Sequence, residues 1–343
     1  MEDYKIVAID LAKTIFHICA INSQGERTLQ KKLHRVELLG FISTTFPKGT
    51  TIAMEACAGC HYWGQQFEKF SFKVLLLKTK DVQVYAKSRQ KNDNNDALAI
   101  AKAAMDPELK SVHLKTIAEQ TICFLHKTRY NTIANRVQKS NSIMSSLMEF
   151  GVVTKVGKTA FAKNAVGYVH QAFDAKAIPK EVYVLLLKEA NEITELFAKE
   201  ALLDSQIKAQ NKQSSRAKLL ETIPGIGAIN ASILSIQPLE SYQKTKNFSA
   251  SLGLVPKQYT TGGKVQLGGI TKQGNRYVRT MLIQGARSIV MRTCKDTFPD
   301  DAIFMWANKL YLRKGFNVAC VAVANKLARL AYACGTKNKS YAA

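Results

Sequence analysis

The chain has 343 residues, 46% of them hydrophobic, so it is long and apolar enough to form more than one folded core. Lys and Arg exceed Asp and Glu by 49 − 26 = 23, and a surplus of this size indicates a polyanionic partner, usually nucleic acid. We find no run of about 18 uncharged apolar residues, no signal sequence and no lipidation motif, so we expect no membrane partner and a cytoplasmic protein.

The first part of the chain alternates apolar runs with amphipathic stretches. Apolar runs that end at Asp10, at the turn beginning with Ser23, at Glu55 and near Lys78 predict β-strands. The intervening segments HRVELLGFISTTF and YWGQQFEKF have helical spacing. Residues 1–112 are therefore predicted to form an α/β domain with a mixed sheet.

The seven cysteines are an odd number scattered through the chain, which predicts reduced thiols rather than a disulfide framework. Cys57-Ala-Gly-Cys60-His61 has the spacing of a c-type haem attachment site, but that chemistry requires export. A zinc site would need a second ligand pair at similar spacing, and the sequence has none. We interpret these cysteines as ordinary buried thiols rather than haem or metal ligands.

The pattern changes in residues 113–215. Two long stretches, near 118–150 and 179–212, carry apolar residues three and four apart with abundant charge. This spacing predicts long amphipathic, coiled-coil-like helices that form an antiparallel hairpin or an oligomerisation arm.

Four acidic residues follow predicted strands or begin a predicted helix. Asp10 and Glu55 end apolar strands, and Asp93 and Asp96 lie on one face of the first turn of an Ala-rich helix. Carboxylates from such positions are suitable ligands for a hard divalent cation, which activates a phosphodiester and its attacker. Each acid also has a simpler interpretation: a helix cap for Asp93 or Asp96, an ion-pair partner for Glu55, and a turn for Asp10.

The segments VAIDLAK, AMEACAGCHYW and KNDNNDALAIAKA occur in that order within the first hundred residues or so. In this order they resemble the ribonuclease H-like (RuvC-like) domain of the DEDD insertion-sequence transposases, a family that includes pilin-gene invertases and bridge-RNA-guided recombinases. The resemblance implies a catalytic site that binds Mg²⁺ or Mn²⁺. It departs from the family pattern in the cysteines of the second segment and in the two asparagines between the paired aspartates. The ligands that it implies are Asp10, Glu55, Asp93 and Asp96.

Glycines become frequent from about Arg216, and residues 216–343 are predicted to form a mainly helical C-terminal domain. LLETIPGIGAINASIL, residues 219–234, has the form of a helix-hairpin-helix element. Gly225 and Gly227 would give a tight turn whose N–H groups hold a phosphate at the start of the second helix. The alternative is a simple turn between two helices.

Ten Lys or Arg and no Asp or Glu lie between Ser241 and Lys295, which predicts a phosphate-binding surface. Residues 257–279 are predicted to form a Gly-rich basic loop that leads into a helix, with Lys272, Arg276 and Arg279 along one helical stripe. Two further helices are expected near 278–294 and 316–334. The predicted nucleic-acid contacts are Gly225, Gly227, Lys257, Lys264, Lys272, Arg276 and Arg279.

The same region resembles the C-terminal transposase domain of the family, which implies a serine nucleophile before paired glycines. Here the segment reads Tyr-Thr-Thr-Gly-Gly-Lys, with threonine in place of serine. A threonine hydroxyl can attack when it is activated, although its β-methyl group crowds the phosphorus. The candidates in order of preference are Thr261, Thr260 and Ser251, followed by Ser249. Helix packing is the alternative role for the two serines.

We therefore expect an α/β plus α protein that transposes or recombines DNA, with the four acids and a C-terminal hydroxyl in one active site. The resemblance implies double-stranded DNA, a structured guide RNA and a homodimer or homotetramer. Two alternatives remain open: a metal-dependent, structure-specific nuclease of the junction-resolvase kind, and a nucleic-acid-binding protein without catalytic activity.

Overall fold

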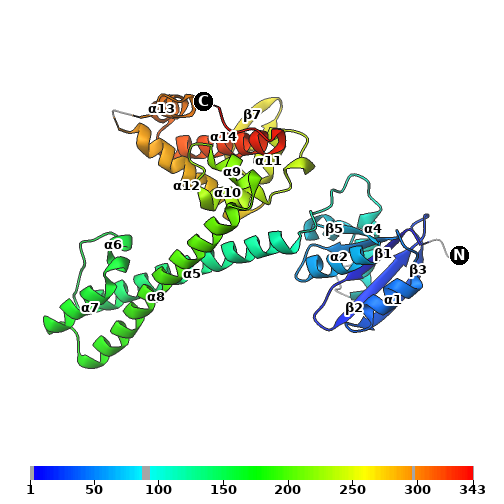
Figure 1. The fold of residues 1–343 in the computed structure, drawn as a ribbon, viewed down its shortest axis with the longest axis horizontal. Coiled ribbons are helices and arrows are strands. Elements are labelled where there is room, and N and C mark those ends of the chain that lie inside the picture. Colours follow the sequence, from blue (N-terminus) through cyan, green and yellow to red (C-terminus); the bar gives the residue numbers. More distant parts are fainter. Residues whose placement is uncertain (1–3, 87–92, 296–297, 343) are drawn as a thin grey trace. The chain divides into compact units, whose positions relative to one another are not determined.

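The computed structural model describes residues 4–86, 93–295 and 298–342 (Figure 1). The chain divides into two compact units, Met1–Gln120 and Thr121–Ala343. The first contains a five-stranded sheet with helices, and the second is mainly helical. The expected combination of a mixed-sheet α/β unit with helical regions is confirmed.

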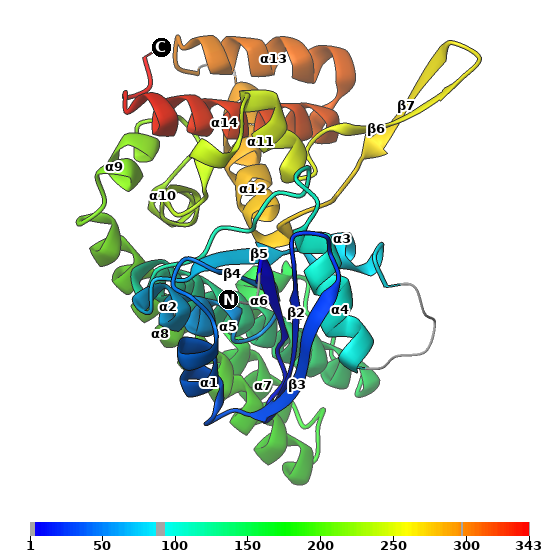
Figure 2. The ribbon, with the colours of Figure 1, turned by 90° about the vertical axis from the view of Figure 1, so that its right-hand side faces the viewer.

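The sheet of the N-terminal unit has the strand order β3-β2-β1-β4-β5 (Figure 2). The first three strands along the chain are antiparallel, whereas β1, β4 and β5 are parallel. Parallel neighbours require crossover connections, which are supplied here by helical segments. The strands are β1 (Ile6–Asp10), β2 (Ile15–Ile21), β3 (Arg27–His34), β4 (Thr51–Glu55) and β5 (Lys73–Leu77).

Both faces of this sheet are covered by helices, so the central strands are apolar on both sides. Val7 and Ile9 of β1 pack with α1 (Leu38–Thr45) and α2 (Cys60–Lys69). The alternate residues Ile6 and Ala8 pack with α3 (Thr79–Gln83) and α4 (Asp93–Ala104). The period-2 alternation of β1 therefore divides the unit into two cores.

Strand β3 was not expected from the sequence. Its residues RTLQKKLH are mostly exposed, because β3 is an edge strand at the end of the sheet. Charged edge strands prevent further strand pairing, and they lack the apolar run that identifies a buried strand.

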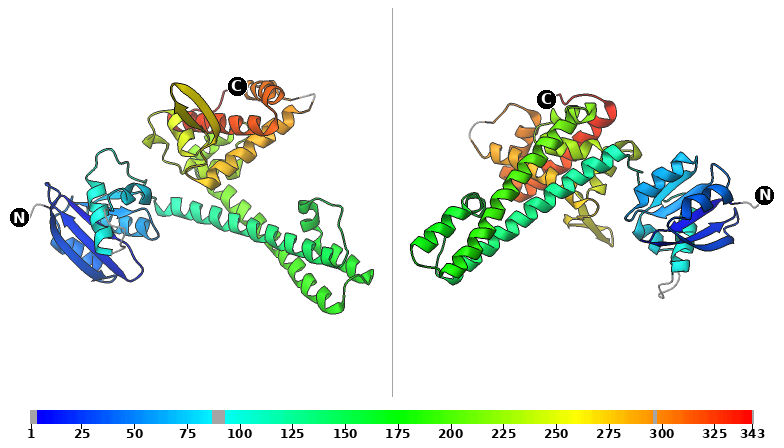
Figure 3. Two further views of the ribbon diagram at one scale, coloured as in Figure 1. Left: turned by 180° about the vertical axis from the view of Figure 1, so that it is seen from behind. Right: turned by 60° about the horizontal axis from the view of Figure 1, so that its bottom comes forward.

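The middle of the chain forms an antiparallel helical hairpin, one of the two arrangements predicted for its long amphipathic helices (Figure 3). Helix α5 (Ile117–Glu149) and helix α8 (Lys180–Asn211) are joined by the short helices α6 (Lys158–Lys163) and α7 (Ala165–Asp174). An apolar cluster near the α6–α7 end contains Ile143, Phe161, Val169 and Ile193.

Ion pairs join the two long helices along the rest of the hairpin. Nη2 of Arg136 lies 3.1 Å from the carboxylate of Glu200, and Nζ of Lys139 lies 2.6 Å from that of Glu192. The guanidinium of Arg136 also lies 4.2 Å from the ring centre of Phe197. These pairs run in opposite directions along α5 and α8, as an antiparallel hairpin requires.

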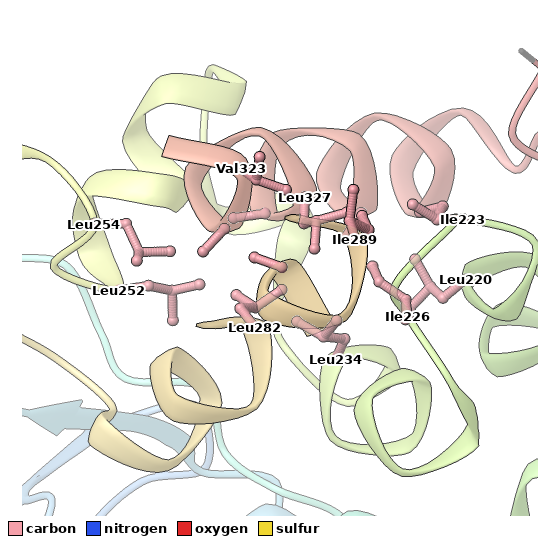
Figure 4. Packing of buried hydrophobic residues seen from close by; sticks show 14 of the residues in the cluster. Leu220, Ile223, Ile226, Leu234, Leu252, Leu254, Leu282, Ile289, Val323 and Leu327 are labelled. Atoms are coloured by element: carbon pink, nitrogen blue, oxygen red, sulfur yellow. The ribbon is translucent and has the colours of Figure 1, made fainter. Parts of the chain in front are cut away.

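The C-terminal part packs around one large apolar cluster, in which Leu282, Ile289, Val323 and Leu327 are central (Figure 4). The expected final helices are present, and α13 is an additional helix between them. The elements are α9 (Ser215–Glu221), α10 (Ala228–Ser235), the 3₁₀ turn η1 (Leu239–Ser241), α11 (Thr245–Ser251), β6 (Pro256–Thr261), β7 (Lys264–Ile270), α12 (Arg276–Thr293), α13 (Ala302–Lys314) and α14 (Phe316–Lys337).

Among the described residues, α14 is the single helix long and apolar enough to cross a membrane. Half of its apolar stretch is buried within the unit, and Val323, Ala324 and Leu327 belong to the apolar cluster. These contacts account for its apolar character as a core helix.

A buried histidine connects α5 to the C-terminal core. The two ring nitrogens of His126 lie 2.8 Å from the Tyr277 hydroxyl and 3.1 Å from the Ser232 hydroxyl. Burial, and to a lesser extent the charge of Arg129, lowers the pKa of His126 from 6.5 to about 4. The folded unit therefore holds this imidazole neutral at physiological pH.

We expect acid to destabilise the C-terminal unit through His126. The unfolded chain takes up a proton near pH 6.5, whereas the folded unit does so only near pH 4, so this histidine stabilises the unit fully above pH 6.5. Below pH 6.5 the free energy of unfolding should fall by up to about 1.4 kcal/mol per pH unit until about pH 4. Denaturant titrations should show a shallower decline for His126→Gln; equal slopes for the two proteins would contradict this role.

Candidate functional site

Two of the predicted acids lie side by side at the carboxyl edge of the sheet. The parallel strands β1 and β4 pair Ala8 with Ala53 and Ile9 with Met54, so the following residues are Asp10 and Glu55. Neighbouring parallel strands in register direct their paired side chains to the same face. Both carboxylates therefore lie on the face that carries Ala8 and Ala53, which α4 covers.

The direction of α4 places its first turn at the same edge. Its C-terminal end lies at the opposite edge, because Met105 Cε is 3.9 Å from where a Cβ would stand at Gly25 of the β2–β3 turn. The charge of Lys102 also acts on the buried Cys19 thiol in β2. A helix whose C-terminal end lies beside the β2–β3 turn begins near the carboxyl ends of β1 and β4. Asp96, in its first turn, is half-buried.

Asp93 is the first residue of α4, but its side chain lies outside the described residues. Strand pairing thus places Asp10 beside Glu55, and the direction of α4 places Asp96 at the same edge of the sheet. The position of the Asp93 carboxylate stays a prediction. Among the side chains that the structure describes, no three of His, Cys, Asp or Glu form a ready-made metal site.

The negative charge at this edge affects a neighbouring thiol. Partial burial of its sulfur, followed by the charges of Cys60, Glu55 and Asp10, raises the pKa of Cys57 to about 11. The hydroxyl of Thr79, the first residue of α3, donates a hydrogen bond of 3.1 Å to Glu55 Oε2. The edge therefore combines clustered carboxylate oxygens, the donor type that Mg²⁺ and Mn²⁺ prefer, with a hydroxyl that orients one of them.

The cysteines of the Cys-x-x-Cys-His segment are both free. Cys60 is buried at the start of α2, whereas Cys57 is exposed. His61 contacts Lys115 through both ring nitrogens, at 3.3 Å from the backbone N and 3.0 Å from Nζ. Burial, and then the charge of Lys115, lowers the pKa of His61 to about 4. These contacts integrate the segment into the N-terminal unit.

The predicted helix-hairpin-helix segment forms α9, a turn and α10. Gly225 has φ +81°, and a Cβ there would lie 2.9 Å from the carbonyl oxygen of Gly285 in α12. Glycine is thus required at this position by its backbone conformation and by its close approach to α12. Gly227 is the N-cap of α10 and is exposed. Of the two glycines, Gly227 is the one available to a phosphate.

The Gly-rich segment is a β-hairpin rather than the expected loop. Strands β6 and β7 pair in register from Gln258–Leu267 to Thr261–Lys264. Gly262 and Gly263 both have positive φ, 57° and 76°, the conformation of a two-residue hairpin turn whose twist matches that of the strands. The candidate nucleophiles Thr260 and Thr261 are the last two residues of β6 and are exposed.

The predicted basic stripe is also corrected. Lys272 precedes α12 and has φ +56°, so it does not share a helix with Arg276. Arg279 is only 8% exposed, and its Nη1 donates to the carbonyl oxygens of Leu252 at 3.0 Å and Gln273 at 2.7 Å. Spacing in the sequence could not distinguish this interior arginine from the exposed Arg276.

The two serine candidates take part in local hydrogen bonds of α11. Ser249 is 1% exposed and donates to the carbonyl oxygen of Lys246. Ser251 is half-buried and donates to that of Phe248 at 2.8 Å. These contacts favour the packing role for the serines, and they leave the two threonines as the exposed hydroxyls of the candidate set.

Two models of known protein families match the N-terminal and C-terminal parts of the chain. Residues 7–151 match a DEDD-type transposase family model named for IS110, and residues 217–300 match the model described as Transposase IS116/IS110/IS902 family.

Similar proteins align along almost the whole chain. A probable family 20 transposase of Pseudomonas aeruginosa is 32% identical and aligns over 98% of each chain. The transposase for insertion sequence element IS1111A of Coxiella burnetii is 31% identical, over 99% of this chain and 92% of its own length. The transposase for insertion sequence element IS1328 of Yersinia enterocolitica is 32% identical, over 98% of each chain.

The contrast between Arg279 and Arg276 gives a matched pair of substitutions. Arg279→Ala leaves two carbonyl oxygens without their donor and should lower the free energy of unfolding by about 2–4 kcal/mol. Arg276→Ala should change the free energy of unfolding by no more than about 0.5 kcal/mol. It should make the slope of log K against log salt concentration for duplex DNA binding shallower by about one unit. Denaturant titration and binding at several salt concentrations measure both effects. If Arg276→Ala instead lowered the stability and Arg279→Ala reduced the salt dependence of binding, the assignment of Arg279 as buried and Arg276 as exposed would be wrong.

Proposed function

The chain belongs to the IS116/IS110/IS902 family of transposases, and from that premise we propose that it cuts and rejoins DNA with carboxylates at the sheet edge and a hydroxyl on the β6–β7 hairpin. The observation that carries this proposal is the pairing of β1 with β4, which sets Asp10 beside Glu55 on the face covered by α4.

Asp10, Glu55 and Asp96 would hold the divalent cation, with Asp93 as the fourth ligand that the family pattern implies. Carboxylate oxygens at neighbouring strand ends fit Mg²⁺ or Mn²⁺ by donor type. When bound, the cation supplies Lewis-acid stabilisation of a phosphodiester undergoing substitution. Thr79 fixes one oxygen of Glu55 through its hydrogen bond, which limits the orientations of that carboxylate.

The attacking group would be Thr261, with Thr260 as the second candidate. Both hydroxyls are exposed near the hairpin tip, whereas those of Ser249 and Ser251 bond to backbone carbonyls of α11. Attack by Thr261 would form an ester bond between its Oγ1 and a DNA phosphate and release the strand's sugar hydroxyl. Attack by that or another sugar hydroxyl would then rejoin the DNA and free the threonine.

Double-stranded DNA is the substrate that the family implies, and the net charge of +23 supports a polyanionic partner. We extend the proposal to a structured guide RNA that selects the target and to a working homodimer or homotetramer. The α5–α8 hairpin exposes apolar side chains, including Val137, Val184 and Leu202, which would supply contacts for such an assembly.

Removing one carboxylate should abolish strand cleavage without loss of DNA binding. We expect Asp10→Asn, Glu55→Gln and Asp96→Asn to reduce cleavage in Mg²⁺ by at least about a hundredfold, because each removes a ligand from the cation. Glu68→Gln, at an exposed position of α2, is the control and should retain activity. Full activity in the Asp10 and Glu55 variants would exclude the proposed metal site.

The hydroxyl can be identified by the protein–DNA bond that it forms. With cognate DNA and Mg²⁺, we expect a denaturant-resistant adduct that peptide mass spectrometry assigns to Thr261. Thr261→Val should abolish the adduct and Thr261→Ser should retain it, whereas Thr260→Val and Ser251→Ala should still form it. DNA nicking without any adduct would instead indicate a nuclease that uses water, and an adduct at another residue would exclude Thr261.

A further inference from the structure

The β6–β7 hairpin has two chemically different faces. Residues paired across an antiparallel ribbon share a face, and successive pairs alternate between the two faces. The Val265 face consists of Gln258, Thr260, Val265 and Leu267. The opposite face, called the Tyr259 face, consists of Lys257, Tyr259, Thr261, Lys264, Gln266 and Gly268.

The ring of Tyr259 lies across a glycine on the Tyr259 face. Its Cε2 is 3.6 Å from the position that a Cβ would take at Gly268, and Cβ of Lys257 is 3.9 Å from the same point. Because Gly268 has no side chain, the ring can lie along the neighbouring strand instead of standing away from it. The side chain is still 59% exposed. The ribbon thus presents an aromatic surface with a lysine toward each end.

The exposure of this ribbon is unusual, because a two-stranded ribbon in water is only marginally stable. All but one of the residues of β6 and β7 are exposed, and Figure 2 shows the ribbon projecting from helices α11 to α14 of its own unit. The surrounding sequence from Ser241 to Lys295 contains no acidic residue, so the ribbon carries positive charge without neutralisation from that segment. A nucleic-acid strand whose bases stack on the aromatic ring and whose phosphates contact the lysines would account for both the exposure and the positive charge of the ribbon.

We propose that the Tyr259 face binds unpaired nucleotides of a nucleic-acid strand. Tyr259 stacks on a base, and Lys257 and Lys264 contact phosphates before and after it. Aromatic stacking combined with lysine contacts is how proteins hold single strands without reading their sequence. This inference rests on the proposed function, which identifies the polyanion as a nucleic acid. It adds that the bound nucleotides are unpaired and names the residues that bind them.

The placement also separates the two candidate hydroxyls. Thr261 shares the Tyr259 face with Lys264, whereas Thr260 lies on the Val265 face and accepts a hydrogen bond of 3.0 Å from Gln258. A strand stacked on Tyr259 therefore meets the Thr261 hydroxyl and not that of Thr260. Stacking on Tyr259 therefore favours Thr261 over Thr260 and places the sugar-phosphate backbone of the bound strand beside the Thr261 hydroxyl.

A tryptophan at position 259 would report stacking directly, because an indole stacked on a base loses fluorescence. The probes are an oligothymidine DNA strand, its oligouridine RNA counterpart and an abasic strand with the same number of phosphates. In the full-length protein we expect quenching of Tyr259→Trp by the first two and not by the third. Leu267→Trp, on the opposite face, should not be quenched, and the signal of the native Trp63 and Trp306 is subtracted by using the parent protein.

Affinities provide the second measurement. Tyr259→Ala should weaken binding of the base-bearing strands by about 5- to 150-fold, Tyr259→Phe should preserve it, and the abasic strand should show little difference. Lys264→Ala should reduce the salt slope for single strands by about 0.7. Val265→Thr should bind within about twofold of the parent.

Quenching of Tyr259→Trp by either base-bearing strand supports stacking on the Tyr259 face, and a preference for DNA or RNA identifies which strand occupies it. The inference would be overturned if only Leu267→Trp were quenched. It would also be overturned if Tyr259→Ala weakened binding of the abasic strand as much as binding of the base-bearing strands, or if it did not change the affinity for any strand. Because these measurements need no cleavage, a protein that cuts DNA but shows no stacking would refute this inference alone. Stacking without cleavage in Mg²⁺ would instead refute the proposed function.

Discussion

The register between β1 and β4 is the constraint on which the rest of the N-terminal unit depends. It places two carboxylates next to each other, an arrangement that electrostatic repulsion disfavours. The register persists because each strand is fixed from both sides: Ile9 and Met54 are buried against α1 and α2, and Ala8 and Ala53 against α4. A shift of either strand by one residue would move the buried side chains of that strand to the wrong face. The repulsion between the two carboxylates is thus offset by the burial of side chains in two apolar cores.

Small residues on one face of the sheet have a related role. Ala8 and Ala53 lie beneath α4, where Ala97 and Ala101 are also buried. Alanines on both surfaces let the helix approach the sheet closely, so its first turn lies near the strand ends rather than above larger side chains. The Ala-rich composition of this helix therefore contributes to the position of Asp96 as well as to helix stability.

The sequence predicted those features that depend on local pattern. Buried strands such as β1 and β4 are recognisable as apolar runs, and α5 and α8 by their amphipathic periodicity. Strand β3 and the β6–β7 hairpin were missed, because exposed strands have no apolar run and their Thr, Gly and Lys residues are equally frequent in loops. The interior position of Arg279 was missed for another reason: it depends on two carbonyl groups of a preceding segment, which no spacing rule encodes. Likewise, strand ends could be identified from sequence, but only the strand order shows that Asp10 and Glu55 are neighbours.

Thr261, the hydroxyl that we propose as the nucleophile, lies in a segment without carboxylates. A threonine hydroxyl is a weak nucleophile and needs a base or a metal ion beside it. Between Ser241 and Lys295, on either side of Thr261, the sequence contains neither Asp nor Glu, whereas the carboxylates at the sheet edge belong to the N-terminal unit. If Thr261 is the attacking group, as we propose, no carboxylate of its own segment can activate it. A carboxylate base, or a metal ion held by carboxylates, must therefore come from outside residues 241–295.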